Sequence, residues 1–122
     1  MSLHDEQAQA LIDVAQRDRL TFQILLRDSD SPLETTLFHA QQALEKGLKA
    51  LLVRAGIVFP RTHDLLELHD LALANGINVS VHRDLLARLA PYAVEFRYLG
   101  VIAPEVNREE ANQAIESLLV ML

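Results

Sequence analysis

The stretch FHAQQALEKGLKALL, residues 38–52, places reactive side chains on an otherwise aliphatic segment. A helical turn of about 100° per residue puts Ala40, Leu44 and Leu48 on one buried side. The polar residues then divide into two sets. Gln41 and Glu45 lie at the border of the buried side, where they can satisfy polar groups of a neighbouring helix, and an outer face carries His39, Gln42 and Lys46.

Two interpretations of that outer face stay open. It is either a solvated helix surface with an ion pair or two between residues four apart, or a surface that meets a partner. Phe38 also points away from the buried stripe, and an exposed aromatic side chain is typical of an interaction surface. Phe38 therefore favours a ligand or partner surface that includes His39, Gln42 and Lys46.

PRTHDLLEL, residues 60–68, is a second candidate. With Thr62 as N-cap, His63 and Asp64 fall in the first turn of a helix, where the dipole favours Asp64 and free N–H groups can hold an anion. Capping explains most of this pattern. The alternative is that His63 is a ligand-binding or catalytic residue.

PYAVEFRYLG, residues 91–100, gathers much of the chain's aromatic content at one helix end. This end either anchors a bundle, or Arg97 and Tyr98 line a cleft or a dimer seam, as Arg and Tyr do at interface hot spots. Arg97 and His63 are thus the candidate catalytic residues. Arg97, Tyr98, His63 and Asp64 join the candidate ligand or partner surface.

Several kinds of site are excluded by inspection. The chain has no Gly-rich phosphate loop, H-E-x-x-H or G-x-S-x-G motif, and no two of its five His residues are four apart on a helix. We therefore predict no metal and no cofactor. Cysteine is absent, which excludes thiolate chemistry and disulfides.

Composition indicates one domain, residues 1–122, in the cytoplasm. Seventeen acidic and eleven basic residues give a net charge of −6, and such a field repels nucleic acid in general. No long apolar run indicates a membrane span, and the polar N-terminus is unlike a signal peptide.

The apolar spacing predicts an all-α fold, an up-and-down antiparallel bundle of four to five helices. The first runs from about residue 4 to 27. The second starts at a capping box of Ser31, Pro32 and Glu34 and ends near Gly56. Two more helices are expected from Thr62 and from Ser80, the latter either kinked or broken at Pro91, and the last begins at a capping box of Asn107 and Glu110.

Three blocks, F-H-A-Q-Q-A-x-E-K, P-x-T-H-D-L and P-Y-A-V-x-F-R-Y, together resemble the HEPN domain family over roughly residues 8 to 120. This resemblance implies a helical bundle that usually forms a homodimer. It also implies pairing with a minimal nucleotidyltransferase, often as a toxin–antitoxin-like pair. Many members are metal-independent ribonucleases that use an Arg and a His four to six residues apart.

Arg97 matches the family's catalytic arginine, but residues 102–104 are Ile, Ala and Pro, and no His follows at the required interval. Without that proton carrier, catalysis loses typically a factor of about 10² to 10⁴. The favoured function is therefore a non-catalytic dimeric interaction module that binds a nucleotidyltransferase partner and a nucleotide or RNA. The alternative is a ribonuclease with a displaced catalytic histidine, His63 or His39.

Overall fold

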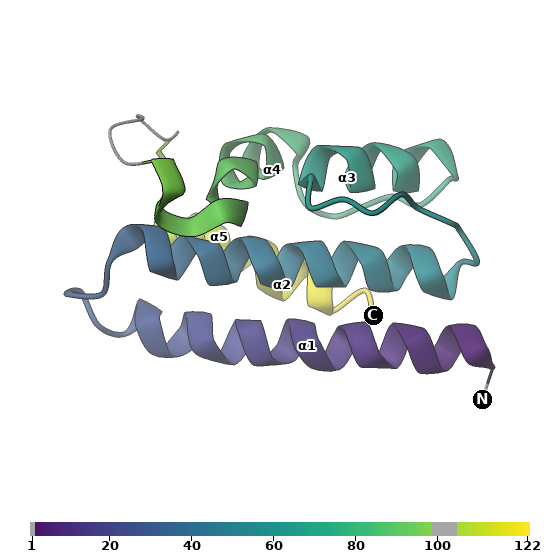
Figure 1. Cartoon of the computed structure of the whole chain (residues 1–122), viewed down its shortest axis with the longest axis horizontal. Coiled ribbons are helices and arrows are strands. Elements are labelled where there is room, and N and C mark those ends of the chain that lie inside the picture. The colour runs from purple at the N-terminus through teal and green to yellow at the C-terminus, as the bar shows by residue number, and fades with distance from the viewer. Residues whose placement is uncertain (1, 99–104) are drawn as a thin grey trace.

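The computed structural model describes residues 2–98 and 105–122, without the side chains of residues 95–98. This part of the chain is all helical (Figure 1), which confirms the predicted fold class. Its elements are α1 (Leu3–Leu26), α2 (Leu33–Arg54), α3 (Leu65–Ala74), α4 (Arg83–Leu89), the 3-10 helix η1 (Ala90–Tyr98) and α5 (Arg108–Leu119).

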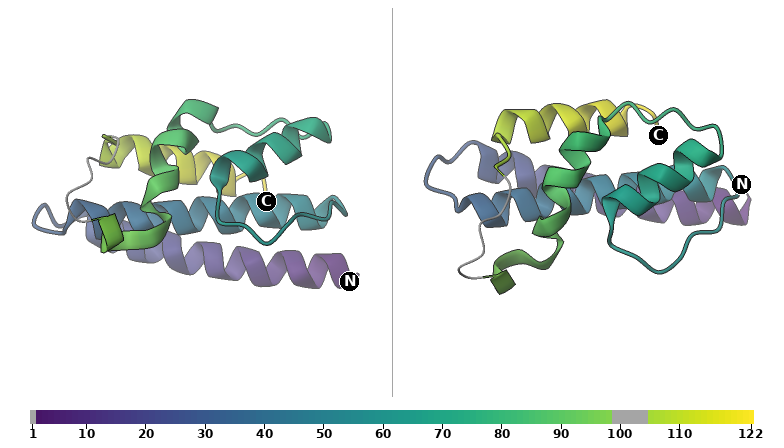
Figure 2. Two further views of the ribbon diagram at one scale, coloured as in Figure 1. Left: turned by 45° about the horizontal axis from the view of Figure 1, so that its top comes forward. Right: turned by 90° about the horizontal axis from the view of Figure 1, so that it is seen from above.

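Helix α2 is the central rod of the bundle. It lies antiparallel to α1 on one side, while α3, α4 and η1 cover its opposite side and α5 lies behind it in Figure 1. Figure 2 shows α4 and η1 crossing α2 steeply, and α3 running more nearly along it. The core is aliphatic apart from Phe22 and Tyr92, and its largest fully buried side chains include Phe22, Leu37, Leu44, Leu48, Leu52, Leu65, Leu68, Leu86, Leu89, Ile115 and Leu118.

Helix α1 is held by polar contacts as well as by packing. It buries only Ala8, Ala15 and Phe22 completely. Arg19 donates two hydrogen bonds to Glu116 of α5, at 2.6 and 3.1 Å, which ties the first helix to the last. Although α1 and α2 are long, no helix within the described ranges is apolar enough to cross a membrane.

Ser31 and Ser80 do not cap the helices that they were predicted to start, because their hydroxyls make other contacts. The Ser31 hydroxyl donates to the Leu25 carbonyl at the end of α1 (2.7 Å), so Pro32 becomes the N-cap of α2 without a side-chain bond. Ser80 donates to the Ser117 carbonyl, and His82 is the N-cap of α4. Asn107 does cap α5, as predicted, by accepting from Glu109 N at 2.8 Å.

The type of helix changes next to Pro91. The α-helical hydrogen bonding of α4 ends at Leu89, and the segment continues as the 3-10 helix η1 to Tyr98. Proline cannot donate a backbone hydrogen bond, and its ring clashes with the preceding turn of an α-helix. The outcome lies between the predicted kinked helix and the predicted break, and it presents the small side chains at the α4–η1 junction to the start of α3.

Candidate functional site

A buried carboxylate lies at the centre of the candidate site. Glu45, in the middle of α2, has no exposed surface. Its Oε2 accepts hydrogen bonds from Lys46 Nζ at 2.8 Å and from Lys49 Nζ at 3.1 Å. These are the only two lysines in the chain. Their side chains are 21 and 12% exposed, so two partly buried positive charges share one negative charge.

The same carboxylate holds the segment that precedes α3. His63 Nδ1 lies 3.1 Å from Glu45 Oε1 and 3.2 Å from Oε2. Gln41, also fully buried, donates from Nε2 to Glu45 Oε1 at 3.3 Å and to the His63 carbonyl at 3.1 Å. Gln42 extends this network by donating to Gln41 Oε1 at 2.7 Å. One turn of α2 therefore positions both the ring and the backbone of His63.

The charge of Glu45 is set by a balance between burial and hydrogen bonding. Burial alone raises the pKa of this carboxyl, but the bonds from Lys46, His63 and Lys49 outweigh that effect and lower the pKa to about 2. Glu45 is consequently ionised at neutral pH. Because two ammonium groups face this single carboxylate, the group carries an excess of positive charge.

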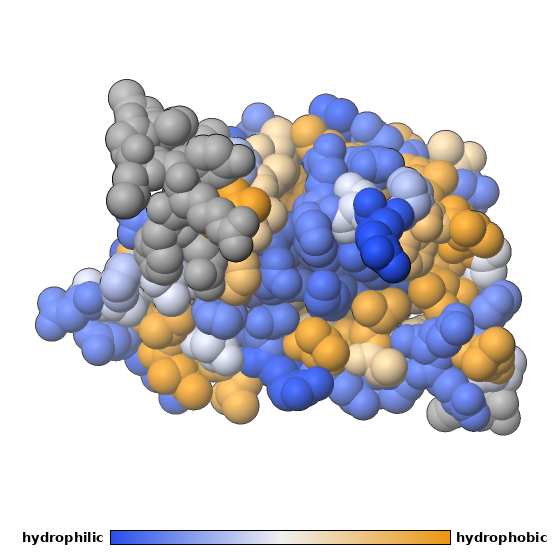
Figure 3. Space-filling view, viewed as in Figure 1, coloured by the Kyte–Doolittle hydropathy of each residue, from blue (hydrophilic) through white to orange (hydrophobic). Residues whose placement is uncertain are grey.

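His63 joins this buried network to an open cleft. Its side chain is 72% exposed, although Nδ1 contacts the buried carboxylate. The cleft has a volume of about 550 Å³. One edge is formed by His63 and Asp64, and the opposite wall is formed by small apolar residues of α4 and η1: Ala87, Ala90, Pro91, Ala93 and Val94. Figure 3 shows hydrophilic side chains gathered over the middle of α2, beside this region.

The turn before α3 differs from the predicted one. Asp64, not Thr62, is the N-cap, and its Oδ1 accepts from Leu66 N at 3.0 Å. Thr62 Oγ1 accepts from Asp64 N at 3.0 Å and closes the preceding turn. His63 and Asp64 thus lie just before α3 rather than in its first turn. From this position the His63 ring reaches back to Glu45 of α2.

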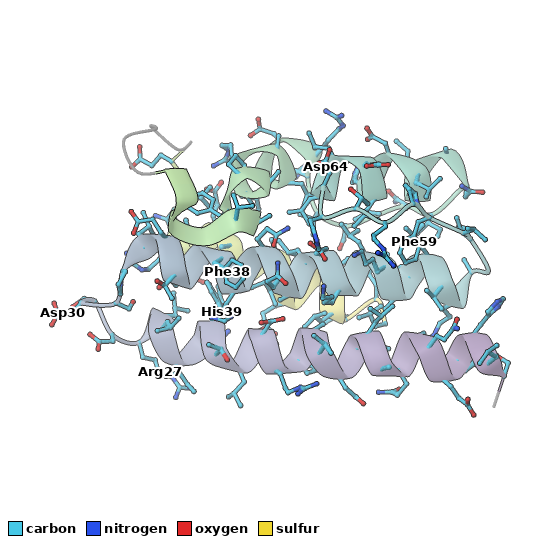
Figure 4. The ribbon with its side chains drawn as sticks, viewed as in Figure 1. Arg27, Asp30, Phe38, His39, Phe59 and Asp64 are labelled. Atoms are coloured by element: carbon cyan, nitrogen blue, oxygen red, sulfur yellow. The ribbon has the colours of Figure 1, made fainter. Side chains whose placement is uncertain are left out.

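The structure joins some of the predicted site residues and separates others. Lys46 and Gln42, assigned to an outer face, are bonded to the border residues Glu45 and Gln41. His39 instead faces α1, where its Nδ1 lies 3.1 Å from Asp18 Oδ1, and only 24% of its side chain is exposed. Phe38 is half-buried, not exposed, and packs edge-on to the His39 ring (Figure 4).

Arg97 and Tyr98 belong to η1, but their side chains lie outside the described residues. Their predicted place at the ligand or partner surface stays a prediction. What the structure does describe is the first part of η1, residues 90–94, which forms one wall of the cleft beside His63.

Sequence reasoning missed the central role of Glu45, which it treated as a border residue. A signal was present: both lysines follow this glutamate, one and four residues later, and a Glu–Lys pair four apart is a known helix contact. The contact with His63 spans eighteen residues and had no local signal. Among residues 2–98 and 105–122, no three His, Cys, Asp or Glu side chains gather to hold a metal ion.

The comparisons agree with the three sequence blocks. The family model described as HEPN domain matches residues 8–120, nearly the whole chain. The chain belongs to the HEPN domain family. Comparison with curated proteins and with solved structures gave no significant match. Within this HEPN domain, Gln41, Glu45 and Lys46 fall in the first block, Lys49 lies three residues after it, and His63 and Asp64 fall in the second.

Glu45→Gln tests the buried carboxylate at the centre of the HEPN domain. At neutral pH we expect a loss of about 3 kcal/mol in the free energy of unfolding, because two partly buried ammonium groups lose their counter-charge. The folded-state pKa of Glu45 is lowered to about 2, so its contribution is complete above the unfolded pKa near 4.5 and is lost as pH falls towards 2.

The difference in unfolding free energy between wild type and Glu45→Gln should therefore be constant above about pH 5 and shrink at lower pH. Urea denaturation from pH 3 to 8 measures it. Glu67→Gln, at an exposed position on α3, is the control and should cost less than about 0.5 kcal/mol. A difference between wild type and Glu45→Gln that stays level down to pH 3 would contradict the assignment.

Proposed function

We propose that this HEPN domain is an interaction module that binds the phosphate group of a nucleotide or of RNA at Lys46, Lys49 and His63. The observation that carries the proposal is the sharing of the buried Glu45 carboxylate by both lysines and by His63, the residue of this group that lines the open cleft. An acceptor oxygen of a phosphate can satisfy the ammonium protons that one carboxylate leaves free.

The charges around Glu45 support this proposal although the chain as a whole is acidic. The chain carries −6 overall, which disfavours non-specific attraction of nucleic acid. Around Glu45, however, two ammonium groups meet one carboxylate and are partly shielded from water, where electrostatic attraction is stronger than at a fully solvated surface. A small phosphorylated ligand, or a single phosphate of RNA, suits such a restricted site better than a long duplex does.

The cleft adds a second kind of contact. Its volume of about 550 Å³ falls in the range of small-ligand sites. The apolar wall at the α4–η1 junction can pack against a base or a similar flat group, while His63 and Asp64 supply polar contacts at the edge. The Asp64 carboxylate repels a phosphate, so the phosphate end of a ligand is expected on the lysine side of His63.

The partner part of the proposal follows from the family. We infer that the domain acts as a homodimer and associates with a minimal nucleotidyltransferase, as in a toxin–antitoxin-like pair. Leu20 and Ile24, four residues apart on α1, are 60 and 56% exposed and provide apolar area for such contacts.

A second candidate function is a ribonuclease in which His63 replaces the missing catalytic histidine. The specific observation in its favour is the Glu45–His63 contact, because a carboxylate that orients an imidazole is the usual support for a general base. This gives His63 the fixed acidic partner that sequence alone did not reveal. Arg97 would be the second participant.

Lys46→Ala and Lys49→Ala should each weaken the binding of adenosine 5′-monophosphate about tenfold or more, because each removes one charged hydrogen-bond donor. Arg54→Ala is the control: it removes the same charge from an exposed position farther along α2. Binding is measured by calorimetry at low salt. Equal weakening by all three variants would indicate general electrostatic attraction instead of a site.

The ribonuclease candidate predicts metal-independent cleavage of RNA that is lost in His63→Ala and in Arg97→Ala. Electrophoresis of an end-labelled RNA in excess chelator measures this cleavage. His39→Ala separates the two candidate histidines, since His39 faces α1. Equal cleavage by wild type and His63→Ala would remove His63 from this role.

The partner inference predicts a solution mass twice that of one 13.7 kDa chain. Light scattering on a size-exclusion column measures it. A nucleotidyltransferase encoded beside this gene should co-elute with the domain when both are expressed together. A single-chain mass would contradict the dimer, and separate elution would contradict the nucleotidyltransferase pairing.

A further inference from the structure

The two nitrogens of the His63 ring have different surroundings. Nδ1 lies within 3.2 Å of both carboxylate oxygens of Glu45. With its pKa lowered to about 2, Glu45 is ionised at neutral pH and can only accept hydrogen bonds. The proton of a neutral His63 ring is therefore on Nδ1, where it is donated to Glu45.

This arrangement decides what Nε2 can bind. In the neutral ring with Nδ1–H, Nε2 carries a lone pair and is an acceptor. The side chain is 72% exposed and lines the cleft, so this acceptor is available to a ligand. A phosphate oxygen is also an acceptor, and two acceptors facing each other cannot form a hydrogen bond. A phosphate can bond to Nε2 only after Nε2 has gained a proton.

We propose that a phosphate group binding beside His63 is accompanied by uptake of one proton from solvent at His63 Nε2, with Glu45 as the positioning residue. This inference rests on the proposed binding of a phosphorylated ligand at this site. A neutral imidazole, a phosphate dianion and one solvent proton become an imidazolium that donates from Nδ1 to Glu45 and from Nε2 to the phosphate. No covalent bond is broken.

The charges around His63 act in both directions. Glu45 and Asp64 place negative charges near the ring, and Lys46 and Lys49 on α2 place positive charges on the same Glu45 carboxylate. On the described part of the facing wall, residues 87, 90, 91, 93 and 94 are uncharged. A bound dianion therefore adds an acceptor at Nε2 that only a protonated Nε2 can satisfy, which is why proton uptake and binding are expected to occur together.

The coupling of proton uptake to phosphate binding has two measurable consequences. Where one proton is taken up, the association constant rises about tenfold for each pH unit that the solution is made more acidic. A ligand that offers a hydroxyl donor instead of a phosphate can bond to the neutral ring directly. Adenosine should therefore bind without proton uptake, and adenosine 5′-monophosphate with it.

Calorimetry of the full chain tests the inference. Adenosine 5′-monophosphate is titrated at about pH 7.5, where its phosphate is largely dianionic, in buffers that differ in ionisation enthalpy. The slope of the observed heat against that enthalpy gives the number of protons taken up. We expect close to one for wild type and close to zero for His63→Gln, whose neutral amide can donate without a proton from solvent.

Two further variants test whether Glu45 positions the His63 ring and whether the effect is specific to His63. Glu45→Gln frees the ring to place its proton on Nε2, so uptake should fall towards zero while the nucleotide still binds. His82→Ala alters an exposed histidine at the N-cap of α4 and should leave uptake at the wild-type value. His63→Gln changes a mostly exposed side chain, so a folded variant is expected even if Glu45→Gln is unstable.

The outcomes separate proton uptake from binding itself. Saturable binding by wild type with no proton uptake, or uptake that His63→Gln leaves unchanged, overturns this inference and leaves the proposed binding function standing. Absence of binding by both adenosine 5′-monophosphate and inorganic phosphate overturns the proposed function, and this inference with it.

Discussion

The candidate site depends on keeping one carboxylate charged in the interior of the bundle. An ionised glutamate without exposed surface is tolerated only when donors surround it, and Glu45 accepts from Lys46, Lys49, Gln41 and His63. Three of these donors come from the same two turns of α2, and the fourth comes from the segment before α3. Satisfying Glu45 therefore fixes the link between α2 and α3, and with it the edge of the cleft.

The distribution of cations explains why an acidic protein can hold a positively charged site. Several arginines are used in paired contacts between helices or along them: Arg19 with Glu116, Arg83 with Asp70, and Arg88 with Asp84 and Glu110. Their planar guanidinium groups suit such bidentate contacts. Both lysines instead share Glu45, and one carboxylate cannot neutralise two ammonium groups. His63 connects this group to a cleft with an apolar opposite wall, a combination suited to a ligand with a charged end and a flat end.

Much of the fold was predictable because it rests on local pattern. The three-and-four spacing of Leu and Ala along residues 33–55 predicted α2, and Asn107 predicted the start of α5. The caps at Ser31 and Thr62 were predicted wrongly, because the Ser31 hydroxyl bonds the end of α1 and the Thr62 hydroxyl closes the turn before Asp64, which is the N-cap. His39 was grouped with Lys46 by helical spacing, yet α1 covers it and supplies Asp18. Spacing along one helix cannot say which neighbour lies over each position.

The sequence by itself determined the helical class, the family, the order of the helices and the residue types available for chemistry, since these follow from periodicity, capping and short motifs. Only the tertiary structure showed that Glu45, rather than the outer face of its helix, is the centre of the candidate site. It also decided that His63 turns one nitrogen towards the interior and leaves the rest of its ring at a cleft. The physical reason is that a buried charge must be satisfied by whatever the fold brings within about 3 Å, and those partners are set by packing across the chain.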